Sequence, residues 1–214
     1  MNIGILGTGA VGRTLGTGFA EAGYDVMMGA RDAKNAKARA WVAATGRRAS
    51  AGTFVQAAEF GDLLVLATAW TGTENAIKLA RSDVIGHKIV MDVTNPIIFK
   101  GDAPPEFALG HRDSGGQRVQ RLLPKARVVK VFNTVGTAHM VKPDFPGGPP
   151  DMLICGNDDD AKREVTEICK RFGWPTIDIG GMEDAQLLES MYRVWVLCGL
   201  RIGGWNHAFK LLRR

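Results

Sequence analysis

A glycine-rich turn close to the first residue constrains this chain more than any other feature. An apolar segment, residues 2–6, is followed at once by Gly7-Thr8-Gly9-Ala10-Val11-Gly12, and residues 13–20 read as the start of a helix. Between a strand and a helix, Gly7 permits a tight turn, Gly9 lets the backbone approach a pyrophosphate, and Gly12 allows helix and strand to pack closely. The free N–H groups at the helix start favour phosphate, so the sequence predicts a dinucleotide-binding unit.

The end of the second expected strand, residues 24–28, indicates which dinucleotide binds. An NAD-preferring site usually places Asp or Glu here, where the carboxylate binds the ribose 2′-hydroxyl. This chain has Gly29-Ala30-Arg31 instead. No carboxylate would repel a 2′-phosphate at this point, and the guanidinium of Arg31 could pair with it. Ala30 and Arg31 therefore predict NADP(H) rather than NAD.

Composition excludes several other classes of protein. Of the 214 residues, 45% are hydrophobic and 23% are charged, which is typical of a globular protein with a sizeable core. The net charge of +5 is not carried by a basic run, so we expect no nucleic-acid partner. Three widely spaced cysteines, Cys155, Cys169 and Cys198, predict free thiols and no zinc site. No signal peptide precedes the first strand, and no apolar run approaches the ~20 residues of a membrane helix, so we expect a soluble, cytoplasmic protein with no membrane partner.

Strand and helix patterns alternate along the chain, which predicts an α/β fold with a doubly wound parallel sheet, the Rossmann NAD(P)-binding fold. We expect residues 1–136 to form the NADP-binding domain. Residues 137–214 would form a smaller C-terminal α/β extension that completes the sheet and the pocket for a second substrate. The longest irregular segment is residues 95–117, and residues 187–212 are expected to be mainly helical, with an interruption near Gly203-Gly204.

Polar residues follow three of the expected strands, and ligands of open parallel sheets bind beyond the carboxyl ends of the strands. Hydroxyl and amide groups there could bind ribose, pyrophosphate or carboxamide without adding charge. Trp70 could wall the pocket or only cover the sheet edge, and Asn95-Pro96 could be only a turn. The candidate cofactor-binding residues are Gly7, Thr8, Gly9, Ala10, Val11, Gly12, Ala30, Arg31, Thr68, Ala69, Trp70, Asn95, Pro96, Asn133 and Thr134.

Motifs for acid–base or nucleophilic catalysis are missing from the sequence. No histidine is paired with an acid at motif spacing, and no Ser or Cys lies in a nucleophile elbow. His139 is the histidine nearest the expected site, but a helix-start or surface role suits it better. Hydride exchange between two cofactor rings needs stacked rings in a dry cleft rather than a protein acid. We therefore expect no catalytic side chain and no metal ligand.

The chain resembles a known family in five segments: Gly7 to Gly12, Gly29-Ala30-Arg31, Asp92-Val93-Thr94-Asn95-Pro96, Phe132-Asn133-Thr134 and Ile154-Cys155-Gly156-Asn157-Asp158. The family is the NADP oxidoreductase, coenzyme F-420-dependent family, which includes archaeal deazaflavin:NADP oxidoreductases and the reductase domain of the STEAP metalloreductases. The resemblance implies NADP on Thr8 to Val11, the 2′-phosphate at Ala30 and Arg31, and a deazaflavin or flavin ring against the nicotinamide. The deazaflavin enzymes tend to have a histidine in place of Asn133, and Asn133-Thr134 is more similar to the metalloreductases and to bacterial members.

The predicted function is hydride transfer between NADP(H) and a deazaflavin (coenzyme F-420) or flavin. One alternative is an NADPH-dependent reductase of a small carbonyl or imine; relatives of that kind place a catalytic lysine on a large helical domain, and no candidate lysine is evident. A second alternative is a non-catalytic NADP-binding redox sensor. The apolar helix from Leu187 onward predicts a homodimer, unless it packs only across its own sheet.

Overall fold

An eight-stranded, mostly parallel sheet forms the centre of the computed structural model, which describes residues 1–98, 106–110 and 113–212. The strand order is β10-β9-β8-β5-β4-β1-β2-β3. The strands are β1 (Asn2–Leu6), β2 (Asp25–Ala30), β3 (Ala49–Thr53), β4 (Leu63–Leu66), β5 (Ile89–Asp92), β8 (Arg127–Lys130), β9 (Met152–Gly156) and β10 (Thr176–Asp178). The order reverses between β1 and β4, and a doubly wound sheet binds ligands at such a point. The predicted α/β fold is confirmed.

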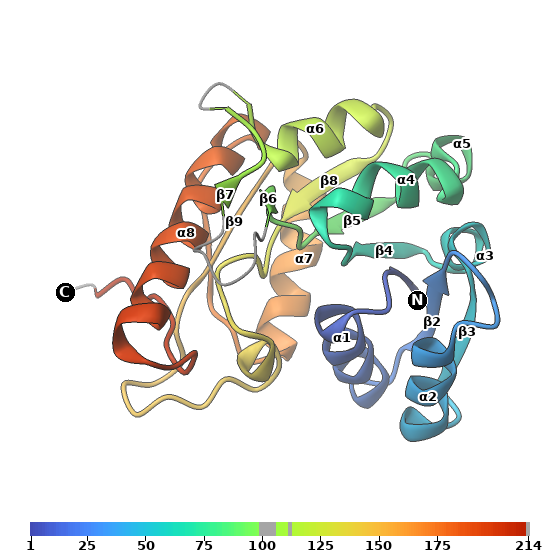
Figure 1. Ribbon diagram of the computed structural model, residues 1–214, viewed down its shortest axis with the longest axis horizontal. Coiled ribbons are helices and arrows are strands. Elements are labelled where there is room, and N and C mark those ends of the chain that lie inside the picture. Colours follow the sequence, from blue (N-terminus) through green and yellow to red (C-terminus); the bar gives the residue numbers. More distant parts are fainter. Residues whose placement is uncertain (99–105, 111–112, 213–214) are drawn as a thin grey trace.

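Helices cover both faces of the sheet, and each face has its own apolar core (Figure 1). On one face, α1 (Ala10–Glu21), α2 (Ala36–Thr45) and α7 (Asp159–Arg171) pack on residues such as Ile3, Ile5 and Val129. The other face is covered by α3 (Phe54–Phe60), α4 (Trp70–Ala80), α5 (Ser82–Ile85), α6 (Gly115–Leu122) and α8 (Ala185–Ile202). The 3₁₀ turns are η1 (Thr137–His139) and η2 (Met182–Asp184). The inner strands β4 and β5 are buried throughout, as parallel strands between two helix layers should be.

The direction of the last two strands differs from the prediction of a wholly parallel sheet. β9 runs antiparallel to β8, with Lys130 opposite Cys155, and β10 is parallel to β9. Parallel neighbours need a crossover, usually through a helix, to return the chain to the starting end of the sheet. Only η1 and a Pro- and Gly-rich loop join β8 to β9, so the chain turns back at the same end.

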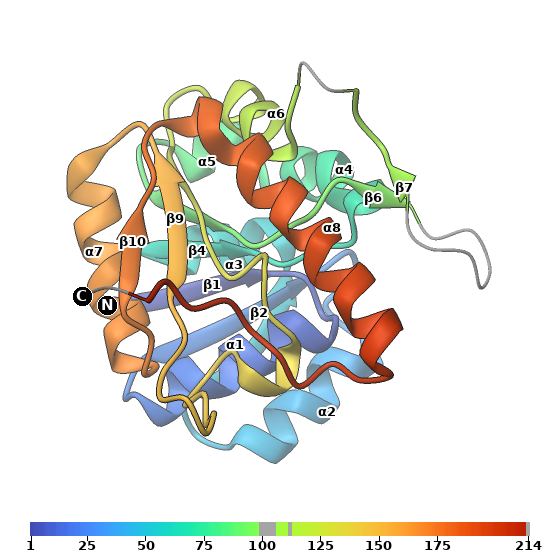
Figure 2. The same cartoon turned by 90° about the vertical axis from the view of Figure 1, so that its left-hand side faces the viewer.

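Two further expectations about segment structure are corrected. The expected irregular segment 95–117 contains two short antiparallel strands, β6 (Ile97–Ile98) and β7 (Glu106–Phe107), and the start of α6, while residues 99–105 and 111–112 lie outside the described part. The helix predicted over 187–212 ends at Ile202, where Gly203 adopts φ 71°. Residues 204–212 are not helical, and they return beside the sheet, where Asp151 N donates to Phe209 O (Figure 2). Gly203 can terminate the helix because a left-handed conformation costs glycine little.

No helix within the described residues is long and apolar enough to cross a membrane.

Candidate functional site

The turn between β1 and α1 has the geometry that the glycine spacing predicts. Gly7 has φ 136°, and a Cβ on it would collide with the carbonyl oxygen of Ala67 on the neighbouring β4 segment. A Cβ on Gly12 would collide with the carbonyl oxygen of Gly7. A Cβ on Gly9 would meet no described atom within 4 Å, because Gly9 faces an open cavity. Gly7 and Gly12 therefore serve the fold, whereas Gly9 keeps space free.

Two helices begin at this cavity without side-chain caps. Gly9 is the N-cap of α1 and Ala69 is the N-cap of α4, and in the described structure neither helix has a cap side chain or an acidic residue in its first turn. A side chain caps a first-turn N–H of α3 at Thr53 and of α7 at Asp158, whereas α5 and α8 also begin without a side-chain cap. Uncapped helix N-termini offer free donors and partial positive charge, so this point suits a pyrophosphate.

Three adjoining cavities extend along the carboxyl ends of the strands, and we name each after one residue. The Arg31 cavity has a volume of about 490 Å³, the Trp70 cavity about 480 Å³ and the Trp195 cavity about 440 Å³. The first two share lining residues on both uncapped helix starts, among them Gly9 and Ala69. The last two share Val11, Val93, Asn95 and Tyr192. Together they form one continuous elongated site across the β1–β4 reversal point.

The Arg31 cavity contains the charged end of the site. Arg31 is exposed at the end of β2, and Gly7, Thr8 and Ala30 lie in the same cavity. Its other lining residues include Asn35, Phe54 and Asn75, which the sequence did not single out. Asn35 Oδ1 accepts the N–H of Ala38, so it caps α2 beside Arg31. A guanidinium near amides and an apolar ring is suited to a phosphorylated ribose and a base.

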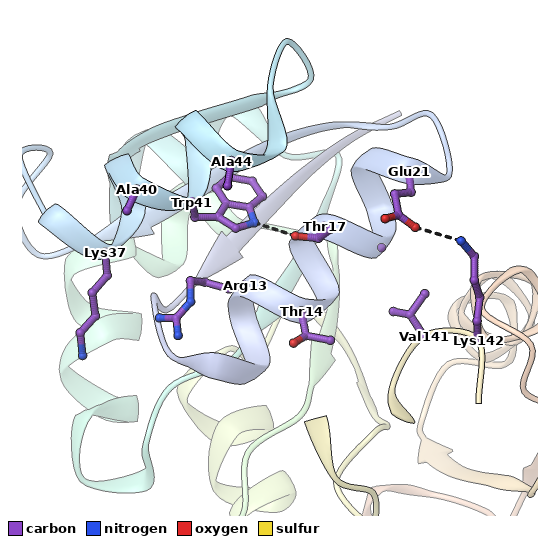
Figure 3. A pocket seen from close by; sticks show the side chains of 11 residues that line it. Arg13, Thr14, Thr17, Glu21, Lys37, Ala40, Trp41, Ala44, Val141 and Lys142 are labelled. Atoms are coloured by element: carbon purple, nitrogen blue, oxygen red, sulfur yellow. Dashed lines mark hydrogen bonds and ion pairs between the residues drawn. The ribbon is translucent and has the colours of Figure 1, made fainter. Parts of the chain in front are cut away.

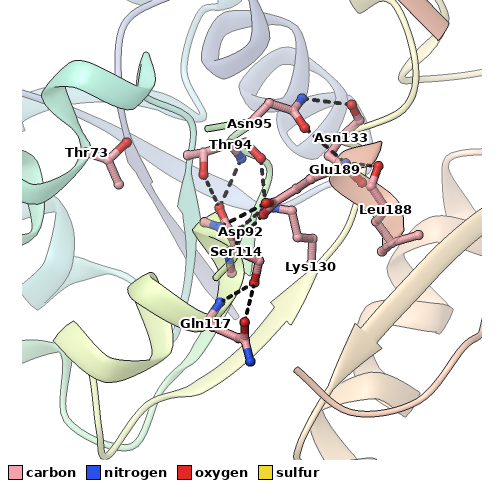
Figure 4. Close-up of polar contacts among 12 residues, drawn as sticks. Thr73, Asp92, Thr94, Asn95, Ser114, Gln117, Lys130, Asn133, Leu188 and Glu189 are labelled. Atoms are coloured by element: carbon pink, nitrogen blue, oxygen red, sulfur yellow. Dashed lines mark hydrogen bonds and ion pairs between the residues drawn. The ribbon is translucent and has the colours of Figure 1, made fainter. Parts of the chain in front are cut away.

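An amide pair connects the Trp70 cavity to the Trp195 cavity. Asn95 Nδ2 donates to Asn133 O at 2.9 Å, and Asn133 Nδ2 donates to Asn95 Oδ1 at 3.1 Å and to Leu188 O at 2.9 Å (Figure 4). The remaining polar atom, Asn133 Oδ1, is buried and has no hydrogen-bond partner among the described residues. An orphaned buried amide oxygen is costly, so Asn133 Oδ1 is a candidate acceptor for a hydrogen bond from a ligand.

Aromatic side chains from α8 and the tail after it wall the Trp195 cavity. Tyr192 and Trp195 stack with ring centroids 6.0 Å apart, and Trp195 stacks on Trp205 at 5.3 Å. Burial raises the pKa of Tyr192 above its ordinary value. Tyr192 carries the one ionisable side chain among the described residues that line the Trp70 and Trp195 cavities. These walls suit a flat, mostly apolar ring.

The structure brings most predicted site residues together, but not all of them. Gly12 is buried beneath the turn, Thr134 is buried outside the three cavities, and Pro96 lines a separate small cavity of about 30 Å³. His139 lines none of the three cavities and contacts Asn206 at 3.1 Å. That Tyr192 and Trp195 line the site was not predicted from the sequence. Their spacing was a usable signal, because aromatic residues three positions apart on a helix lie on the same face.

A further cavity of about 830 Å³ lies apart from this site (Figure 3). It is an open groove between α1 and α2, where Trp41 Nε1 donates to Thr17 Oγ1 at 3.0 Å and Lys142 pairs with Glu21 at 3.0 Å. Arg13, on its rim, donates from Nη1 to Thr8 O at 2.7 Å and so tethers the glycine-rich turn. Within the described residues, no group of three His, Cys, Asp or Glu side chains could hold a metal ion.

Several known proteins are similar to this chain in sequence and in structure. Residues 2–96 match the family NADP oxidoreductase, coenzyme F420-dependent. An inferred F420-dependent NADP reductase from Arthrobacter sp. FB24 is 32% identical, with both chains covered completely and a TM-score of 0.93. The F420-dependent NADP reductase of Methanocaldococcus jannaschii is 31% identical over 148 residues, which cover 68% of this chain and 65% of that protein.

More distant relatives differ in length or share the fold alone. The metalloreductase STEAP3 of Rattus norvegicus is 26% identical over 189 residues, so 88% of this chain matches only 36% of that protein. An imine reductase of Streptomyces aurantiacus is 17% identical with a TM-score of 0.66, over 94% of this chain and 62% of the other. The full coverage and 32% identity of the Arthrobacter structure decide the family. The chain belongs to the coenzyme F420-dependent NADP oxidoreductase family and is an NADP-dependent oxidoreductase.

Proposed function

We propose that this protein transfers a hydride between NADP(H) and a deazaflavin of the coenzyme F420 type or a flavin. The observation that carries the proposal is the elongated site itself, in which a cationic end, two uncapped helix starts and an aromatic-walled end follow one another. When bound there, NADPH would supply a hydride from C4 of its nicotinamide to the second ring, which would also take up a proton from solvent. The names of the Arthrobacter and Methanocaldococcus relatives support F420 as that second substrate.

The residues present fit NADP(H) along its whole length. In this proposal Arg31, which lines the cavity, binds the 2′-phosphate, and the first-turn N–H groups of α1 and α4 bind the pyrophosphate. Thr68, Ala69 and Trp70 wall the passage between the two ends. The orphaned Asn133 Oδ1 is suited to accept a hydrogen bond from the amide of the nicotinamide.

The Trp195 cavity is proposed to orient the second ring against the nicotinamide. Its walls include aromatic and aliphatic groups, among them Val11, Tyr192 and Trp195. Holding two reacting rings at contact distance in a dry cleft can supply most of the acceleration of a hydride transfer. Burial keeps Tyr192 protonated, so it does not serve as a base.

Reduction of a small carbonyl or imine is the second candidate, and the position of Tyr192 favours it. Such a reaction needs a proton for the product oxygen or nitrogen in addition to the hydride, and Tyr192, whose hydroxyl stays protonated, lines both inner cavities. A non-catalytic NADP sensor is the third candidate; it would bind NADPH and reduce no acceptor.

An acceptor panel separates these candidates. Purified protein is mixed with NADPH and, in parallel, with coenzyme F420, FMN, FAD, riboflavin and a set of small ketones and cyclic imines, and NADPH oxidation is followed by absorbance. Turnover with F420 or flavins that survives in Tyr192→Phe supports ring-to-ring transfer. Turnover confined to carbonyls or imines and abolished by Tyr192→Phe would replace it with the second candidate. NADPH binding without turnover would favour the sensor.

A further inference from the structure

Three ionisable side chains meet in the dry interior beneath the Trp70 and Trp195 cavities. Asp92 ends β5, Lys130 ends β8 and Glu189 lies on α8; the side chains of Asp92 and Lys130 are 0% exposed and that of Glu189 is 3% exposed. Lys130 Nζ lies 3.0 Å from Asp92 Oδ2, 2.8 Å from Glu189 Oε1 and 2.8 Å from the backbone oxygen of Thr94 (Figure 4). The three ammonium hydrogens thus have three acceptors.

The two carboxylates also hold backbone groups of other elements. Glu189 accepts the N–H of Gly115 at 2.9 Å and of Gly116 at 3.0 Å, which are the first residues of α6. Asp92 Oδ1 accepts the N–H of Thr94 at 3.0 Å and its hydroxyl at 2.7 Å. Burial alone would disfavour the ammonium of Lys130, but the charges of Asp92 and Glu189 outweigh it and raise its pKa above the ordinary value. Lys130 therefore keeps its ammonium form in the interior, with an acceptor for each of its three hydrogens.

Such a network adds little to the stability of the fold, because the free-energy cost of removing the charged groups from water offsets most of their mutual attraction. A structural explanation therefore has to lie in what the network holds in place. On the sheet side it fixes Thr94, which lines the Trp70 cavity and precedes Asn95. On the helix side it fixes Glu189, which lies one turn before Tyr192 on α8. The residue before Glu189 is Leu188, whose backbone oxygen accepts a hydrogen bond from Asn133. Both walls of the inner site are thus tied to one ammonium group.

We propose that Asp92, Lys130 and Glu189 are positioning residues that set the distance between the Asn95–Asn133 pair and the α8 wall. This rests on the proposed function, because the space so defined is the one assigned to the nicotinamide and the second ring. None of the three lines the Arg31, Trp70 or Trp195 cavity among the described lining residues, so they act through Thr94, Leu188 and Tyr192. The Arg31 cavity lies beyond the reach of these bonds, so its ligand contacts should be independent of them.

This independence gives a test that needs no turnover. 2′,5′-ADP occupies only the adenosine half of an NADP site, whereas NADP⁺ spans both halves. The dissociation constants of both are measured by calorimetry for wild type, Glu189→Gln and Asp92→Asn. A glutamine or asparagine amide turns an N–H₂ group toward either the ammonium or a backbone N–H, so each substitution breaks the network with little change in volume. Asp178→Asn is the matched control, since Asp178 pairs with the nearly buried Lys162 at 2.7 Å near β10, away from the three cavities.

We expect 2′,5′-ADP to bind every variant within twofold of wild type. NADP⁺ should bind Glu189→Gln and Asp92→Asn at least tenfold more weakly, and Asp178→Asn as wild type does. Equal weakening of both ligands, or no weakening of either, would overturn the positioning role. Failure of wild type itself to bind 2′,5′-ADP would overturn the NADP assignment instead, which separates the two proposals.

An uncharged variant separates position from stability. Asp92→Asn, Lys130→Met and Glu189→Gln are combined, so that no unpaired charge remains in the interior. We expect its unfolding temperature to lie above that of Lys130→Met alone, while the tenfold loss of NADP⁺ relative to 2′,5′-ADP persists. Recovery of wild-type NADP⁺ binding in this combined variant would show that any well-packed interior suffices, and it would refute the proposal.

Discussion

Substituting Gly9 by alanine should abolish tight cofactor binding without harming the fold. Gly9 has φ −70° and ψ 179°, which alanine adopts readily, and its Cβ would meet no described atom within 4 Å. Alanine lowers the entropy of the unfolded chain, which stabilises by about 0.4–1 kcal/mol, but it is a poorer N-cap than glycine, which acts in the opposite direction. We expect a net change of less than about 1 kcal/mol, and hence a melting temperature within about 4 °C of wild type.

The effect of Gly9→Ala on binding should be much larger. The new methyl group lies where the pyrophosphate would approach the first-turn N–H groups of α1. Loss of one hydrogen bond to a charged group costs about 1.5–3 kcal/mol, so the dissociation constant of NADP⁺ should rise on the order of 10- to 150-fold. Calorimetry gives the affinity, and scanning fluorimetry with and without NADP⁺ gives the stability.

Gly7→Ala is the matched comparison within the same turn. Gly7 has φ 136°, and its Cβ would collide with the Ala67 carbonyl, so this substitution should lower the melting temperature by several degrees even without ligand. A Gly9→Ala variant that binds NADP⁺ as wild type does would refute the placement of the pyrophosphate. So would a Gly9→Ala variant that is as unstable as Gly7→Ala.

Other predictions follow from single contacts. Arg31→Ala should weaken NADPH by about 10- to 150-fold through the loss of one charge-assisted contact, yet change NADH binding less than about twofold; equal losses for both cofactors would contradict the role of Arg31. Lys130→Met leaves two buried carboxylates unpaired, so it should cost about 3–5 kcal/mol and lower the melting temperature by roughly 6–20 °C. The pKa of Lys130 is raised in the folded state, so its stabilisation is present at low pH and is lost only as pH rises through that folded-state pKa. The stabilisation that the Lys130 ammonium gives the wild type should therefore stay constant between about pH 6 and pH 9. The exposed apolar side chains Leu187, Val194 and Leu197 on α8 predict a homodimer. Light scattering measures the oligomeric state. A monomer at micromolar concentration, or a dimer unaffected by Leu197→Asp, would refute that interface.

The parts of the site that the sequence predicted are those set by local rules. The Gly7–Gly12 turn follows from spacing between a strand and a helix, and Arg31 follows from its place at the end of β2. Asn95 and Asn133 could be named because strand ends of a parallel sheet meet at one edge, although their mutual hydrogen bonds could not.

Features that depend on long-range packing were not predictable in this way. The reversal of β9 depends on where the chain turns after η1, and the Tyr192 wall depends on how α8 crosses the sheet. Lys130 follows two valines at the end of a strand, a position where a lysine is ordinarily solvated. Its burial became evident only when Glu189, 59 residues later by their numbering, was brought beside it at 2.8 Å.

Direct transfer of the nicotinamide hydride to a second ring is the central claim, and isotope transfer tests it most directly. NADPH carrying deuterium at C4 in either of its two configurations is mixed with the protein and oxidised deazaflavin in ordinary water, and the reduced product is analysed by mass spectrometry and NMR. The account predicts one deuterium at C5 of the deazaflavin from one of the two labelled forms and none from the other, because the cleft presents a single face of each ring. Absence of deuterium from the reduced deazaflavin with both forms, or transfer from both alike, would contradict it.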